Sequence, residues 1–128
     1  MGRTEALARV WIGFGALAGL GAVAMAAVAA HALPERLDAA AMQIMRSALQ
    51  MQGWHALALL FTGLWAPRGG IAAHLAGAAF VAGLLLFCGA VYALALFGLH
   101  SAAVAPIGGT LLMLGWLLLG CSVFRRAR

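Results

Sequence analysis

The stretch GGIAAHLAGAAFVAGLLLFCGAVYALALFGLHSAAVAPIGGTLLMLGWLLLGCSVF (residues 69–124) decides the fold, because it runs for 56 residues without Asp, Glu, Lys or Arg. As one straight helix it would be roughly 84 Å long, whereas the hydrocarbon core of a bilayer is ~30 Å thick. The stretch must therefore fold back on itself. The predicted break lies at residues 97–101, where a glycine, a histidine and a serine interrupt the apolar run. Pro106 suits the first turn of the returning helix.

The composition of the whole chain excludes most soluble classes of protein. Of its 128 residues, 66% are hydrophobic and only 9% are charged, whereas a soluble domain carries about 25% charged residues. Eight basic and three acidic side chains are too few to give so apolar a chain a water-soluble surface. A soluble enzyme and a nucleic-acid module are thereby excluded. We expect one membrane domain over residues 1–128.

Two further charge-free runs precede the long one, at residues 10–34 and 47–67. Together the three runs predict an all-α integral membrane protein with four transmembrane helices in a compact bundle. Between the first two spans, apolar residues recur every three to four positions, which predicts an amphipathic surface helix at about residues 35–47. The four predicted spans cover residues 10–31, 48–66, 71–97 and 104–124.

The arginines predict the orientation of these spans. Of the eight arginines, only Arg36 and Arg46 fall on one side of the membrane. His74 lies near the boundary on the other side, where we expect it to meet lipid headgroups. The excess of arginine on the opposite side places both termini in the cytoplasm. That side holds Arg3, Arg9, Arg68, Arg125, Arg126 and Arg128.

Seventeen glycines suggest close helix packing, since helices in lipid associate by close backbone approach rather than by the hydrophobic effect. A dimerisation face built from one glycine row is the alternative to packing within the bundle. Trp11, Trp65 and Trp116 are expected to be interfacial or packing residues. The glycines predicted to pack helices together are Gly15, Gly19, Gly83, Gly89, Gly108 and Gly109.

Polar side chains inside a membrane are costly and usually paired or functional. The predicted spans bring four of them, His31, Gln52, His55 and Tyr92, toward one boundary. They predict a hydrogen-bonded cluster that joins helices, or a binding site for a lipid headgroup, a quinone or another small ligand, or a site for proton handling. Two histidines with Cys88 could bind a metal ion, but no fixed metal-ligand spacing occurs, so no metal site is predicted.

Four segments carry a family resemblance: GAVAMAAVAAH (21–31), QGWHALALL (52–60), FCGAVYALAL (87–96) and APIGG (105–109), followed by a Gly-Trp pair at 115–116. They resemble the domain of unknown function 423 family, which is related to the eukaryotic transmembrane protein 256. The resemblance implies a small bacterial inner-membrane protein of four helices with no assigned activity. The positions that match the family pattern are His31, Gln52, His55, Gly89, Tyr92, Pro106, Gly108 and Gly109.

The chain departs from that family pattern where hydroxyl side chains are usual, with Met51, Cys88, Ala90 and Ala105 in their place. The predicted site is therefore less polar than in its relatives. We expect a structural or accessory protein of the bacterial inner membrane, with no catalytic residues, cofactor or nucleic-acid partner. Its partners would be the lipid bilayer and either a second copy or a larger membrane complex. The alternative is binding or transport of a lipid, quinone or other small ligand at the outer leaflet, and metal or proton handling is weaker still.

Overall fold

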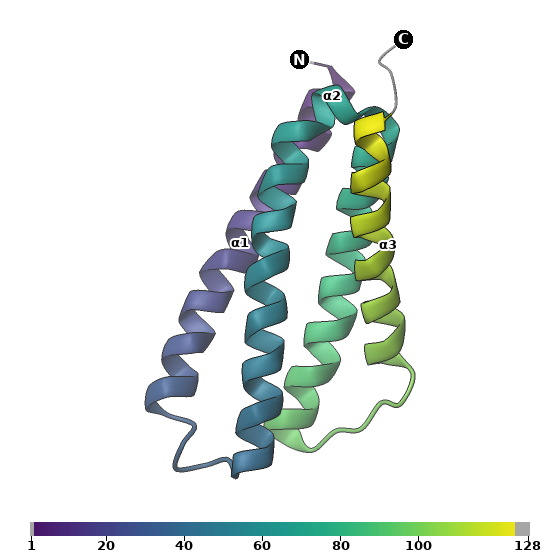
Figure 1. Ribbon diagram of the computed structural model, residues 1–128. Helices are drawn as coiled ribbons and strands as arrows, with labels where there is room; N and C mark the ends of the chain where they lie inside the picture. Colours follow the sequence, from purple (N-terminus) through teal and green to yellow (C-terminus); the bar gives the residue numbers. More distant parts are fainter. Residues whose placement is uncertain (1, 125–128) are drawn as a thin grey trace.

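The computed structural model describes residues 2–124 and consists of three helices, α1 (Arg3–His31), α2 (Ala39–Phe97) and α3 (Val104–Phe124). Figure 1 shows α1 descending, α2 rising and then turning back, and α3 rising again. The first residue of α1 and the last residue of α3 consequently lie at the same end as the reversal of α2, which we call the reversal end. The opposite end, where the chain segments 32–38 and 98–103 lie, is called the loop end.

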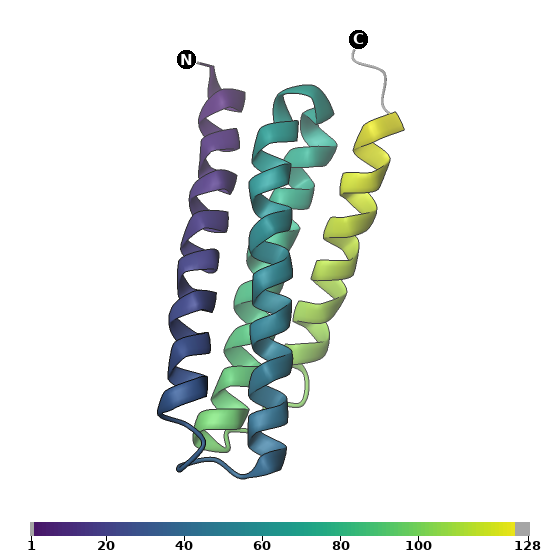
Figure 2. The ribbon, with the colours of Figure 1, turned by 60° about the vertical axis from the view of Figure 1, so that its left-hand side comes forward.

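A single residue, Gly70, makes α2 turn back on itself. Its backbone angles are φ 60° and ψ −148°, while the residues on either side are helical. Without this reversal, the 59 residues of α2 would form a rod roughly 89 Å long at ~1.5 Å per residue. We call residues 39–69 the first arm and residues 71–97 the second arm. The two arms run side by side in opposite directions (Figures 1 and 2).

The prediction of four transmembrane helices is wrong. Over residues 2–124 the structure has three helices that are long and apolar enough to cross a membrane, namely α1, α2 and α3. Residues 48–66 and 71–97, predicted as separate spans, both belong to α2. No loop separates them because Pro67 is accommodated inside the helix and Gly70 alone takes the non-helical conformation.

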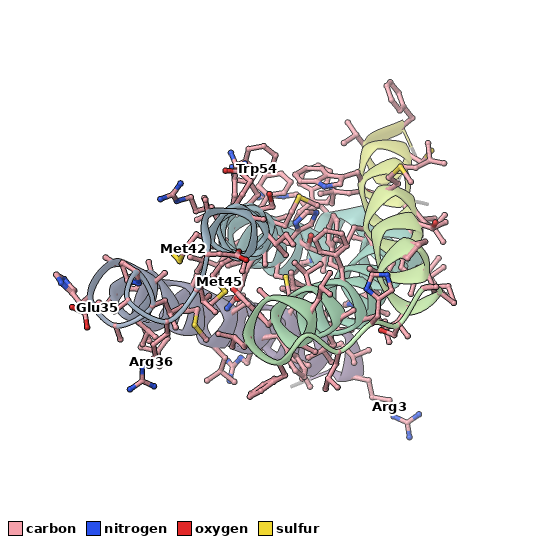
Figure 3. All side chains as sticks on the ribbon, turned by 90° about the horizontal axis from the view of Figure 1, so that it is seen from below. Arg3, Glu35, Arg36, Met42, Met45 and Trp54 are labelled. Carbon is pink, nitrogen blue, oxygen red and sulfur yellow. The ribbon has the colours of Figure 1, made fainter. Side chains whose placement is uncertain are left out.

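The predicted surface helix at residues 35–47 is not a separate element either. Residues 32–38 form turns and bends, and α2 begins at Ala39. Asp38 caps that helix, since its Oδ1 accepts a hydrogen bond from the Ala41 backbone nitrogen at 2.8 Å, as expected of an N-cap aspartate. Figure 3, viewed from the loop end, shows Glu35 and Arg36 projecting outward from the short connection.

The two arms of α2 form the centre of the molecule. Within residues 2–124, α1 and α3 each pack against α2 and not against one another, so they cover different faces of the hairpin (Figure 2). A large apolar cluster runs through the hairpin around Leu59, Phe80 and Leu112. A smaller cluster near the loop end contains Ala29, Met45 and other residues of α1 and both arms.

Glycines allow the closest helix crossings. A Cβ atom on Gly15 would lie 2.9 Å from the Ala56 carbonyl oxygen, and one on Gly83 would lie 2.8 Å from the Gly108 carbonyl oxygen. Three of the six predicted packing glycines, Gly15, Gly83 and Gly108, therefore lie at crossings. A Cβ on Gly19 or Gly109 would meet its nearest neighbour at 3.9 Å or 3.8 Å, and none lies within 4 Å for Gly89.

The outer surface is apolar along all three helices. Leu20 and Val23 of α1, Leu64 of α2 and Leu117 of α3 are all more than 60% exposed. A water-soluble protein of this size would not present so continuous an apolar surface. The surface is that of a membrane protein, in agreement with the composition.

Candidate functional site

Gln52 and Tyr92 form the central polar contact between helices. The Tyr92 hydroxyl donates a hydrogen bond of 2.6 Å to Gln52 Oε1, and Gln52 Nε2 donates one of 2.9 Å to the Ala18 carbonyl oxygen. These two bonds join the second arm, the first arm and α1. Gly21 makes room for the amide, because a Cβ there would lie 2.9 Å from Gln52 Nε2.

His55 faces a different neighbour. Its Nδ1 atom lies 2.6 Å from the Met51 carbonyl oxygen, and because a carbonyl oxygen can only accept, Nδ1 carries the proton. Nε2 is then free to accept the 3.1 Å hydrogen bond that Trp116 Nε1 donates from α3. The ring is also packed against Phe80 at 5.7 Å and Trp116 at 5.9 Å between ring centroids. Both ring nitrogens of this buried histidine are therefore engaged inside the protein.

His31 stands apart from these contacts. It is the last residue of α1 and is exposed at the loop end. Of the four residues predicted as one cluster, the structure brings Gln52 and Tyr92 into direct contact. It turns His55 toward α3 and leaves His31 on the surface.

Two further interhelical bonds involve residues that were not assigned to the site. Trp11 Nε1 of α1 donates to His74 Nδ1 on the second arm at 3.0 Å. Trp65 Nε1 on the first arm donates to the Ser122 hydroxyl on α3 at 2.9 Å. Both lie toward the reversal end. The sequence does indicate that these two tryptophans form hydrogen bonds, because the indole N–H of a tryptophan in apolar surroundings usually has an acceptor.

A groove adjoins the contact between Gln52 and Tyr92. It has a volume of about 420 Å³ and is lined by α1 and the second arm, with Gln52 and Leu59 contributed by the first arm. Its walls are mostly apolar and hold no charged residue. Residues that line it include Phe14, Leu17, Gln52, Leu85, Gly89 and Tyr92.

Metal-ligating side chains do not gather at this site. Across residues 2–124 no group of three or more His, Cys, Asp or Glu side chains is placed to hold a metal ion. Cys88 is buried beside the groove, where its thiol lies 3.6 Å from the Ala48 carbonyl oxygen. Cys121 is exposed on α3, and both cysteines are free thiols.

Trp116→Phe is expected to lower the free energy of unfolding by about 1 kcal/mol, the usual worth of one interhelical hydrogen bond in a membrane protein. The substitution keeps an aromatic ring against Phe80 but removes the donor to His55. Trp54→Phe is the matched control, because Trp54 is 56% exposed on the first arm. Unfolding in mixed micelles of SDS and a mild detergent measures both changes, and equal losses would contradict the assigned bond.

These features define the class of protein: a small helical membrane protein whose buried polar side chains bond one helix to another. The model of the family described as protein of unknown function DUF423 matches residues 25–109. The chain belongs to this family, and the resemblance seen in the sequence is confirmed. The matched region contains all four predicted polar residues and the crossing of α2 with α3 at Gly108.

The sequences of curated relatives align with this chain over most of its length. A UPF0382 membrane protein of Haemophilus influenzae is 38% identical over 111 residues, which are 86% of this chain and 90% of the relative. One from Staphylococcus epidermidis is 38% identical over 112 residues, or 87% and 92% of the two chains. The UPF0382 inner membrane protein YgdD of Escherichia coli is 33% identical over 117 residues, or 90% and 89%. No solved structure matches the chain.

Proposed function

We propose that this protein is a structural or accessory component of the bacterial inner membrane, without catalytic activity of its own. One observation carries the proposal: the polar side chains inside the helices serve to bond helices together. Gln52 and Tyr92 bond to each other, and both ring nitrogens of His55 have partners within the chain. Side chains bonded in this way hold the helices in fixed positions relative to one another, which is what a structural role requires.

The proposed location and orientation have separate support. The Escherichia coli relative is named an inner membrane protein, and we extend that location to this chain. Arg3, Arg9 and Arg68 belong to the reversal end, where α1 begins and α3 ends. The positive-inside rule then assigns this end and both termini to the cytoplasm. Arg125, Arg126 and Arg128, which the sequence predicts for the same side, lie outside the described residues.

An accessory role also requires a surface for a partner. Because α1 and α3 each contact only α2 within residues 2–124, their outer faces remain available to another protein or to a second copy. Two glycines on these faces, Gly13 and Gly120, have nothing within 4 Å of a Cβ position. Small residues of this kind allow another helix to approach closely.

Native mass spectrometry of the protein released from its own membranes tests the proposal. We expect the chain to leave the membrane with a partner protein or a second copy, in a fixed ratio. Gly13→Leu or Gly120→Leu should reduce that association by about tenfold or more, because each adds bulk to an outer face without entering the core. Gly53→Leu on α2 is the control, since this glycine also faces open space. A chain released only as a monomer under every mild condition would contradict an accessory role.

A second candidate function, the binding of a small lipid-soluble ligand, is supported by the groove beside Gln52 and Tyr92. Metal or proton handling has less support: both ring nitrogens of His55 have partners, and within residues 2–124 no group of three or more metal-ligating side chains gathers around the buried, unpartnered Nε2 atom of His74.

A further inference from the structure

The groove between α1 and the second arm has the length of one lipid chain. Val81 and Tyr92 both line it, and their separation along the helix is about 16 Å at ~1.5 Å per residue. Half of the ~30 Å hydrocarbon core, the depth of one leaflet, is about 15 Å. The groove therefore suits a single apolar chain lying along the helices within one leaflet.

The walls of the groove indicate a neutral occupant. Apolar side chains such as Phe14, Leu17 and Leu84 make up most of its lining, and no Asp, Glu, Lys, Arg or His contributes to it. An ion would find no countercharge in this groove, and an unpaired charge in an apolar environment is strongly disfavoured. Arg46, by contrast, lines a separate cavity of about 310 Å³ beside Ala26 and Ala30.

The polar end of the groove offers a hydrogen-bond donor. A glutamine amide carries two N–H groups, and the bond from Gln52 Nε2 to the Ala18 carbonyl oxygen uses one of them. Gln52 Oε1 already accepts from Tyr92. The amide therefore has a second N–H that an acceptor such as a carbonyl oxygen would satisfy.

Packed side chains adjoin the same end of the groove. Tyr92 packs not only into the large cluster but also against the smaller cluster near the loop end, which contains Ala29, Met45 and Ala95. A ligand that follows the groove toward Gln52 thus meets packed side chains beyond the amide. A compact polar end fits here, and the bulky charged headgroup of a phospholipid does not.

We propose that this groove binds a neutral lipid with one apolar chain and a compact carbonyl-bearing end, the class to which lipid-soluble quinones belong. The chain lies between α1 and the second arm, and the carbonyl accepts a hydrogen bond from the Gln52 amide. The proposal names the ligand class of the second candidate function. It does not depend on the accessory role, which concerns the outer faces of α1 and α3.

Gly89 provides a variant that blocks the groove without disturbing the helices. It lines the groove, and nothing lies within 4 Å of the position its Cβ would occupy. The leucine side chain of Gly89→Leu would therefore project into the space that the ligand needs. Gly53→Leu is the matched control, because Gly53 also has open space at its Cβ position but does not line the groove.

The experiment uses a photoreactive decyl-substituted benzoquinone added to the full-length protein in lipid nanodiscs, followed by mass-spectrometric mapping of the labelled residues. In the wild-type protein we expect label on residues 14–18 of α1 and 81–92 of α2. Gly89→Leu should reduce that labelling by about tenfold or more, whereas Gly53→Leu and Arg46→Gln should leave it unchanged. Thermal unfolding of each variant shows that it is folded.

Three outcomes would overturn the proposal. Label spread evenly over the lipid-facing surface would mean that the groove holds no preferred ligand. Labelling that falls in Arg46→Gln would show that the ligand binds in the cavity beside Arg46 and would indicate an anionic ligand. Stronger labelling of the groove by a photoreactive phospholipid than by the quinone would contradict the proposed class. The wild-type map alone decides the first of these, even if Gly89→Leu does not fold.

Discussion

Gly108→Ala is expected to lower the free energy of unfolding by about 3 kcal/mol, the upper end of the usual cost of overpacking. The added Cβ would collide with the Phe87 backbone nitrogen and would lie 2.9 Å from both the Phe87 Cα and the Gly83 carbonyl oxygen. These are backbone atoms of the second arm, so no side-chain rotation relieves the contact. Helix α3 would have to move away from the hairpin, which separates Leu112 from the core.

Gly109→Ala is the matched control for this prediction. The same methyl group added one residue later would approach only the Phe87 ring, at 3.8 Å, which is an ordinary contact. Alanine is favoured over glycine in a helix by about 1 kcal/mol, so this variant should be as stable as the wild type or more so. Unfolding in mixed micelles of SDS and a mild detergent measures both. Equal stability of the two variants would show that α3 does not cross the second arm at Gly108.

The sequence was enough to predict a membrane protein, because a chain with so few charged residues cannot form a water-soluble surface. A stretch of 56 residues without a charged side chain cannot cross ~30 Å of hydrocarbon as one straight rod. Its predicted break coincides with the end of α2 at Phe97, where Gly98 takes the left-handed conformation with φ 66°. Length and charge are properties of the chain alone, so these expectations needed no knowledge of packing.

The number of helices could not be obtained in the same way. Pro67, Arg68, Gly69 and Gly70 have the composition of a loop, and the predicted spans leave them between two separate helices. In the structure the first three are helical and only Gly70 departs from helical geometry. A pattern of residue types indicates that a chain turns, but it does not say whether the turn takes one residue or several. For the same reason the sequence predicted a separate surface helix at residues 35–47, whereas residues 39–47 are the first part of α2.

The directions in which the polar side chains point depend on packing as well. Gln52 and His55 are three residues apart, and both were predicted to belong to one polar cluster. At ~3.6 residues per turn they differ by about 60° around the helix. The first arm has close neighbours on several sides, so this angle is enough to direct Gln52 toward α1 and the second arm and His55 toward α3. Sequence periodicity places residues on faces, and only the neighbouring helices decide what each one meets.

Gly70→Ala is expected to destabilise the protein by about 3 kcal/mol, because φ 60° with ψ −148° belongs to a backbone region that only glycine occupies readily. An L-residue there would strain the backbone, although nothing lies within 4 Å of the Cβ position. The loss would therefore come from the backbone and not from a clash. Since both arms depend on this one residue for their antiparallel arrangement, the strain would fall on the centre of the molecule.

Gly98→Ala separates this effect from the general cost of replacing a glycine that has positive φ. Gly98 has φ 66° and ψ 15° at the end of α2, and an L-residue adopts that left-handed helical conformation at a cost of about 1 kcal/mol. Asparagine tolerates the same conformation, so Gly98→Asn should be milder still, while Gly70→Asn should remain severe. Unfolding in mixed micelles ranks the four variants. If both substitutions at Gly70 cost no more than those at Gly98, the reversal of α2 does not depend on the conformation assigned to Gly70.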